Sequence, residues 1–317
     1  MLNIKINKSF NIENKINKSN KMGNKKLKIK ITPYLYVSPS TILIMLLCLY
    51  PMVYTFILSF TNLNMYHWKN PSFIGLDNYI NILGRLDGDF FIVVFRTIIW
   101  TILNMVIHVS LAVILALLLN MEKLWFRSLY RTILILPWAV PGYISTLIWK
   151  GMFNYDFGAI NAILNKLGIS SINWLNDPLN AFIACIIVNV WLATPFMMIV
   201  CLGALQSIDK TFYEAAEIDG ATGYQKFRYL TLPLMKPAML PAVIITIFVT
   251  FKQFDVVYLL TRGLAGKTDL LITYAYNRAF TDYNYGYSAA FSVIIFILLL
   301  VLTRFRKKMI KSAEEVY

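Results

Sequence analysis

Long stretches without Asp, Glu, Lys or Arg divide the chain into apolar segments. These stretches comprise residues 31–68, 97–121, 132–149, 178–208, 237–251 and 283–303. A membrane-crossing helix needs about 20 mostly apolar residues, because roughly 30 Å of hydrocarbon is crossed at about 1.5 Å per residue. The fifth stretch is shortened only by Lys252, since apolar residues resume at Val256–Leu260. The pattern predicts six membrane spans, at residues 37–60, 93–119, 130–153, 181–205, 238–261 and 287–304.

The composition agrees with an all-α, polytopic membrane protein. Of the 317 residues, 58% are hydrophobic and 15% charged, whereas soluble domains average about 45–50% apolar and about 25% charged residues. This excludes a disordered chain, a secreted disulfide scaffold and an ordinary cytosolic enzyme. Cys48, Cys185 and Cys201 all lie within apolar stretches, so we expect neither disulfides nor a thiolate metal site.

The net charge of +14 comes mostly from basic residues that lie on one side of the predicted membrane domain. In the six-span arrangement, 21 basic residues lie on the side of the two termini and eight on the opposite side or near its edge. Cytoplasmic loops carry the excess of Lys and Arg, so both termini are expected in the cytoplasm of a cell membrane, and nucleic acid is not an expected partner. The predicted regions are a basic cytoplasmic arm (1–30), a membrane domain (31–304) and a cytoplasmic tail (305–317).

The cytoplasmic loop 206–236, between spans 4 and 5, has its own helical signals. Asp209 or Thr211 is a suitable N-cap for a helix through residues 213–218, and Gly220 is a suitable left-handed stop. A second short helix at residues 222–229 is expected to end before Pro233. The hairpin exposes aromatic and small apolar side chains to the cytosol, so it predicts a protein partner surface. The alternative is an amphipathic hairpin lying on the bilayer.

This loop resembles the EAA loop of ABC-importer membrane subunits, whose helix docks into a groove on a cytoplasmic ATPase. The resemblance is carried by Glu214, Ala215, Ala216, Asp219, Gly220, Ala221, Gln225, Phe227, Leu232 and Pro233. It implies that ATP-driven closure is transmitted through this loop. The coupling residues so implied are Glu214, Ala215, Ala216, Asp219 and Gly220.

Two flanking segments are similar to carbohydrate-uptake permeases of the MalF type. They are Val190–Met198 and the segment 268–280, with Thr268, Asp269, Leu270, Leu271, Tyr274, Tyr276, Ala279 and Phe280. The resemblance implies a type I ABC importer permease for maltose or maltodextrins. Its implied partners are a second homologous permease, two ATPase subunits that bind ATP and Mg, and an external sugar-binding protein. The chain departs from the best-known member by having six spans rather than eight and no large domain between spans 1 and 2.

Sugar recognition requires aromatic platforms beside neutral hydroxyl or amide groups. Span 4 offers Trp191 and Phe196 on either side of Pro195, and one face of span 5 carries hydroxyl, amide and apolar side chains at helical spacing. In the MalF-like family, the matching positions line the mid-membrane sugar site. They are Trp191, Leu192, Phe196, Thr246, Val249, Thr250 and Gln253. The alternative is that these residues only pack helices together.

Other polar residues at membrane depth predict structural contacts. Trp100, Asn104 and His108 recur every four residues in span 2 and form a stripe suited to interhelical hydrogen bonds. A single histidine without a second ligand is no metal site. Lys252 and Asp255 stand three residues apart in span 5, where they are expected to neutralise each other.

No motif for ATP hydrolysis or other covalent chemistry is found in the sequence. Gly266-Lys267-Thr268 ends like a phosphate-binding loop, but Thr261 occupies the position where that motif requires its first glycine. We therefore expect no catalytic residues, and no cofactor in this chain. Rival functions are the same class with another oligosaccharide or glycerol phosphate as cargo, an ion-coupled secondary transporter that uses His108 and Asp255, and, least favoured, an intramembrane enzyme.

Overall fold

A computed structural model describes residues 31–84, 89–121, 123–264 and 266–314, with side chains described as far as residue 304. Within these ranges the regular elements are helical, apart from one isolated antiparallel bridge between Thr61 and Phe73. The all-α class is therefore confirmed. The predicted basic arm at residues 1–30 and the last residues of the predicted tail lie outside the described ranges.

The chain separates into two compact units, residues 1–57 and 58–317. In the first unit, one helix begins at Ile31 and continues through a π-helical turn at Met45–Leu49 into α2 (Tyr50–Leu58). None of the residues in its most apolar window is buried. An apolar helix without a polar face needs a membrane or another chain as its surroundings.

Most of the helices belong to the second unit. They are α3 (Asp77–Leu83), α4 (Asp89–Asn120), α5 (Arg127–Ala139), α6 (Gly142–Met152), α7 (Ala159–Lys166), α8 (Pro178–Gln206), α9 (Lys210–Ile218), α10 (Gly223–Gln225), α11 (Leu232–Phe251), α12 (Asp255–Thr261), α13 (Leu271–Phe280) and α14 (Tyr285–Glu314). Among the described residues of the whole chain, five helical segments are long and apolar enough to cross a membrane, or six if the bent pair α5 and α6 forms one crossing. The predicted spans thus correspond to helices in the structure.

The third predicted span, residues 130–153, is not one straight helix. It consists of α5 and α6, whose axes differ by 96°. Pro137 lies inside α5, Val140 is extended, and Pro141 caps the start of α6. A proline disfavours helical geometry in the residue before it and cannot donate the usual backbone hydrogen bond. The helix is therefore interrupted at Val140, and the third predicted span is a bent pair of helices.

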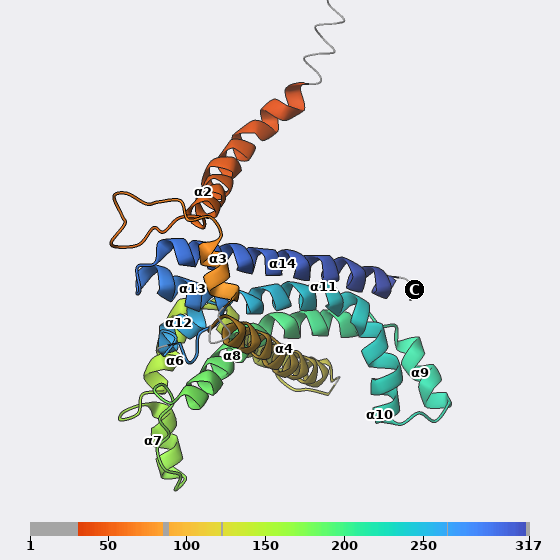
Figure 1. Ribbon diagram of the computed structural model, residues 1–317. Coiled ribbons are helices and arrows are strands. Elements are labelled where there is room, and N and C mark those ends of the chain that lie inside the picture. The colour runs from red at the N-terminus through yellow and green to blue at the C-terminus, as the bar shows by residue number, and fades with distance from the viewer. Residues whose placement is uncertain (1–30, 85–88, 122, 265, 315–317) are drawn as a thin grey trace, which may run out of the picture. The chain divides into compact units, whose positions relative to one another are not determined.

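Small side chains let the central helices of the second unit approach closely. Helix α11 lies between α8 and α14, and α4 packs along α8 (Figure 1). Ala112 and Ala116 of α4 are fully buried in one cluster with Met197 and Cys201 of α8. Small residues at such interfaces increase van der Waals contact between membrane helices. Helices α9 and α10 lie at one end of α11, and α12 and α13 lie at the other (Figure 1).

Candidate functional site

The polar stripe of α4 faces the interior of the helix bundle. Trp100, Asn104 and His108 are fully buried. The indole nitrogen of Trp100 donates to the main-chain oxygen of Thr250 over 3.1 Å, and the amide of Asn189 donates to Asn104 over 2.8 Å. These contacts confirm the predicted interhelical hydrogen bonds. His108 differs, because its Nδ1 contacts the main-chain oxygen of Asn104 in its own helix and its Nε2 has no partner in the described part of the chain.

The candidate sugar-site residues of α8 lie beside aromatic side chains from the bent pair. Trp191 is 38% exposed and meets Trp149 edge-on at a centroid distance of 5.7 Å. Phe196 is half-buried, and its ring centroid lies 6.1 Å from that of Trp138. Leu192 packs against the neighbouring core. Trp138 and Trp149 were missed in the sequence, because only the bend between α5 and α6 brings them to α8. Helix α8 thus presents aromatic surfaces at these two positions.

The candidate residues of α11 are divided between two environments. Thr246 and Thr250 are buried at 8% and 2% exposure, and the hydroxyl of Thr246 donates to the main-chain oxygen of Ala242 over 2.8 Å. Val249 is 49% exposed, and Gln253 lies half-buried beyond the end of the helix. Within this chain, therefore, Val249 and Gln253 are accessible, whereas the two threonines face neighbouring helices.

Lys252 and Asp255 do not share a helical face. Helix α11 ends at Phe251, with Lys252 as its C-cap, and α12 starts at Asp255. Both side chains are exposed. The ion pairs of the described residues do not include one between them. The predicted mutual neutralisation is wrong because the helix breaks between the two residues.

The start and end of α9 follow the sequence signals. Asp209 is the N-cap, and its Oδ1 accepts hydrogen bonds from the main-chain nitrogen and the hydroxyl of Thr211 at 2.9 and 3.0 Å. These bonds lower the pKa of the Asp209 carboxyl. Gly220 has a φ of +74°, and the main-chain nitrogen of Ala221 donates to the oxygen of Ala216. The predicted cap and left-handed stop are confirmed.

The implied coupling residues lie on the exposed helix α9 and directly after it, and α9 is held against its own chain. Side chains of the implied coupling set are exposed, except that Ala216 is half-buried; the set is Glu214, Ala215, Ala216, Asp219 and Gly220. Ile218 is 88% exposed. On the other side, the hydroxyls of Tyr213 and Thr231 lie 3.0 Å apart, and Lys226 forms an ion pair with Glu217 at 2.7 Å. The arrangement fixes α9 while it leaves an apolar end free for a partner.

The helix after Gly220 does not end before Pro233. Helix α10 starts with a capping box between Thr222 and Gln225 and continues through a π-helical turn at Lys226–Thr231 into α11. Pro233 lies in the first turn of α11, where a proline is tolerated. The predicted stop was wrong, because the π-helical turn and this position together accommodate the proline.

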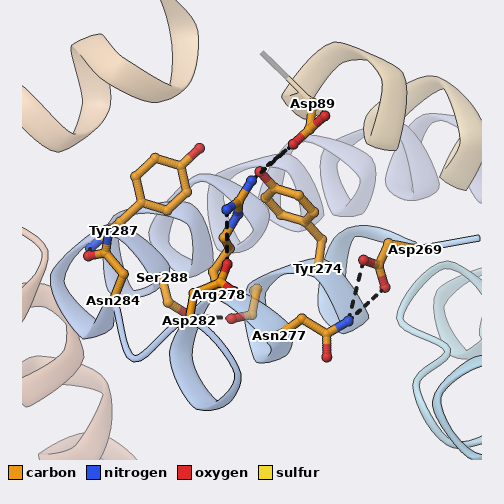
Figure 2. Close-up of polar contacts among 10 residues, drawn as sticks. Asp89, Asp269, Tyr274, Asn277, Arg278, Asp282, Asn284, Tyr287 and Ser288 are labelled. Carbon is orange, nitrogen blue, oxygen red and sulfur yellow. Dashed lines mark hydrogen bonds and ion pairs between the residues drawn. The ribbon is translucent and has the colours of Figure 1, made fainter. Parts of the chain in front are cut away.

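A polar cluster lies at the opposite end of α11 from α9 and was not identified in the sequence. Figure 2 shows Arg278 of α13 between Asp89 and Asp282, at 3.0 and 2.9 Å. Tyr274 donates its hydroxyl to Asp89 over 3.1 Å, and the Arg278 guanidinium lies 4.8 Å from the ring centre of Tyr274. Asn277, the neighbour of Arg278, donates to Asp269 over 3.1 Å. The start of α4 is thereby tied to α13.

Arg96 connects α4 to the loop before α13. Its guanidinium donates to the main-chain oxygens of Gly266 and Asp269 over 2.7 and 3.0 Å. Asp269 is 2% exposed. Its burial raises the pKa of the carboxyl, and hydrogen bonds from Thr273 and Asn277 oppose that shift. Because these partners are far apart in the sequence, neither the charges at the span ends nor the family resemblance at Asp269 and Tyr274 showed which residues meet.

Three transport permeases from three organisms are similar to this chain. GanP of Bacillus subtilis, a galactooligosaccharide transport permease, is 36% identical over 89% of this chain and 71% of its own length. The trehalose/maltose permease MalF of Thermococcus litoralis is 37% identical over 85% of this chain and 90% of its own length. The MalF maltose/maltodextrin permease of Vibrio vulnificus is 38% identical over 76% of this chain, which spans 49% of that protein.

A solved structure has the same fold. A chain of a bacterial ABC transporter that imports alginate superimposes with a TM-score of 0.76 at 24% identity, over 91% of this chain and 98% of its own. Residues 108–312 match the model of the binding-protein-dependent transport system inner membrane component family. With five or six apolar helices of sufficient length, this protein is a multi-pass membrane protein. The chain belongs to the family of inner membrane components of binding-protein-dependent transport systems.

Proposed function

We propose that this chain is a permease subunit that imports maltose or short maltodextrins. The main support is its similarity to the trehalose/maltose permease of Thermococcus litoralis over 90% of that protein. The aromatic surfaces of Trp191 and Phe196 on α8 and the accessible Val249 and Gln253 at the end of α11 are chemically suited to a sugar. Thr250 holds α11 against α4, because its main-chain oxygen accepts a hydrogen bond from Trp100, whereas the buried Thr246 bonds within α11.

The subunit works in an assembly, and ATP is hydrolysed by a separate subunit. We propose that two ATPases bind the coupling loops of this chain and of a second homologous permease, and that an external binding protein delivers the sugar. In this arrangement both termini are cytoplasmic, so α9 faces the ATPase. Its exposed Ile218 supplies an apolar contact of the kind that a partner groove covers. Closure of the ATPases then changes the packing of the permease pair.

Galactooligosaccharide is the second candidate cargo, because GanP is 36% identical over 89% of this chain. The same polar and aromatic groups accept either sugar class. The ion-coupled alternative has less support, since His108 is bonded within its own helix and Asp255 is exposed at the start of α12. The two residues form no shared polar network.

The test is purification of the intact assembly from membranes, followed by identification of its subunits and measurement of sugar-stimulated ATP hydrolysis. Maltose and maltotriose should stimulate hydrolysis more than trehalose, a galactooligosaccharide or glycerol 3-phosphate. If the galactooligosaccharide stimulated ATP hydrolysis more than maltose does, galactooligosaccharide would be the cargo. Uptake by this chain alone, abolished by an uncoupler and independent of ATP, would contradict the whole proposal.

A further inference from the structure

A cavity of about 640 Å³ lies at the end of the second unit where α4 begins. Its lining comes from α4, α12, α13 and the loop between α12 and α13. This volume is within the range of about 300–1,000 Å³ that small-molecule sites occupy. The cavity does not include any of the candidate mid-membrane residues on α8 and α11. In the proposed topology it opens on the external side.

Several charged groups around this cavity are held in place, whereas Arg262 and Lys267 of its lining are exposed and take part in none of the ion pairs of the described residues. Arg278 is fixed between Asp89 and Asp282, and Arg96 is bonded to main-chain oxygens. Asn277 donates to the buried carboxylate of Asp269. The lining carries four cationic side chains and three carboxylates, so its charges nearly balance and it offers both oriented donors and acceptors. A neutral polyhydroxylated ligand can use both kinds of group, whereas an anion would bind through Arg262 and Lys267 alone, and competition by phosphate distinguishes the two.

An aromatic surface adjoins this polar lining. Tyr258 of α12 lines the cavity and stacks on Phe254 at 4.9 Å with an interplanar angle of 15°. Tyr276 of α13 lies 4.8 Å from Tyr258 and 4.6 Å from Phe280, which is 58% exposed. Four aromatic rings thus support one another beside the cavity. Rings that are fixed in this way present apolar faces at low entropic cost.

We propose that this cavity, the outer pocket, is a second saccharide-binding site that holds a sugar unit before it reaches the middle of the membrane. The ring of Tyr258 would cover the apolar face of the sugar, while Asn277 and the carboxylates of Asp89 and Asp282 would bond its hydroxyls. The inference rests on the proposed function, because a sugar must be the cargo. It adds a site, separated from Trp191, that accepts the sugar at the external entrance.

The experiment uses the complete importer in lipid nanodiscs and equilibrium binding of radiolabelled maltotriose without the binding protein. Two molecules are expected per copy of this chain. In the double variant Tyr258→Ala/Asn277→Ala, the affinity of one of the two sites for maltotriose should fall by about tenfold or more. This is the change expected when about 1.4 kcal/mol of binding free energy is lost. Trp191→Ala should weaken only the other site. Tyr283→Ala, at an exposed tyrosine outside the cavity lining, should bind as the parent does.

A second variant does not depend on removal of packed side chains. Thr281 is exposed and lines the cavity, so Thr281→Trp should fill the outer pocket and reduce binding to one molecule. Binding of one molecule by the parent, abolished by Trp191→Ala alone, would overturn the outer pocket and leave the proposed function standing. If inorganic phosphate displaced maltotriose from the outer pocket, the saccharide site would be overturned in favour of an anion site. No binding of maltotriose and no stimulation of ATP hydrolysis would refute the proposed function as well.

Discussion

Asn189 of α8 and Asn104 of α4 share a hydrogen bond of 2.8 Å in a buried interface between the two helices. The amide of Asn104 also donates to the main-chain oxygen of Trp100 in its own helix. Each amide is therefore oriented, and the pair fixes the rotation of α4 relative to α8. Asn189 lies about 200° around α8 from Trp191, so the bond on the buried side fixes the rotation at which α8 presents Trp191 on its exposed side.

Asn189→Ala should destabilise the protein by about 1 kcal/mol, the usual size of an interhelical hydrogen bond in a membrane protein. Asn104 keeps a buried oxygen without its donor in this variant, which adds to the loss. Thermal unfolding of the purified assembly measures the effect. Asn176→Ala, at an exposed asparagine before α8, is the control, and an equal melting temperature for both variants would contradict the prediction.

Gly220→Val should uncouple ATP hydrolysis from sugar uptake. The φ of +74° disfavours a side chain at Gly220, although no atom lies within 4 Å of the position that a Cβ would take. The strain, about 1–2 kcal/mol for a left-handed residue, is therefore conformational and should shift the end of α9. Hydrolysis and uptake are measured in reconstituted vesicles. Gly223→Ala, where the added Cβ also has open space and φ is not positive, should behave as the parent. Unchanged uptake in Gly220→Val would count against the coupling role.

Trp191→Ala should reduce sugar transport without loss of the ATPase subunits. Removal of the indole eliminates an aromatic face that contacts Trp149, and a lost stacking contact of about 1 kcal/mol reduces affinity roughly fivefold. Uptake at several sugar concentrations separates affinity from maximal rate. Ile187→Ala is the matched control, because Ile187 lies four residues earlier on α8 with 37% exposure, compared with 38% for Trp191. The same sugar affinity in both variants would remove Trp191 from the site.

Asp269→Asn should change how stability depends on pH. Burial raises the pKa of Asp269 above its ordinary value of 3.8, so the ionised form is disfavoured in the folded state. Its contribution to stability is largest below that value and is lost as the pH rises through the raised pKa. The variant cannot ionise and should melt about 2 °C higher than the parent at pH 7, with the difference disappearing towards pH 4. A variant that is less stable at every pH would show that attraction to Arg96 outweighs the effect of burial.

Local signals predicted much of the fold. Stretches free of charged residues marked the long helices, and Asp209 and Gly220 marked the two ends of α9 because capping and left-handed geometry depend on single residue types. The rest depends on contacts between distant segments. The sequence placed Thr246, Val249 and Thr250 on one face, yet the two threonines are buried and Val249 is exposed. Val249 lies about 100° around the helix from Thr250, at the edge of that face.

The polar cluster around Arg278 required the tertiary structure. Asp89 and Arg278 are 189 residues apart in sequence, and each looks like an ordinary charge at the end of an apolar stretch. Arg96 is equally unremarkable until its two main-chain partners on the loop before α13 are known. Charge patterning indicates which side of the membrane such residues face, but not which of them meet.

The 96° bend at Val140 leaves two legs that are each too short to reach across hydrocarbon. α5 has 13 residues and α6 has 11, which correspond to about 20 and 16 Å at about 1.5 Å per residue. The peptide groups at the bend therefore lie at depth in the bilayer, where lipid offers them no hydrogen bonds. Protein or water must cover them. We therefore expect a neighbouring subunit or an aqueous path, rather than acyl chains, next to the bend between Trp138 and Tyr143, which are both 57% exposed.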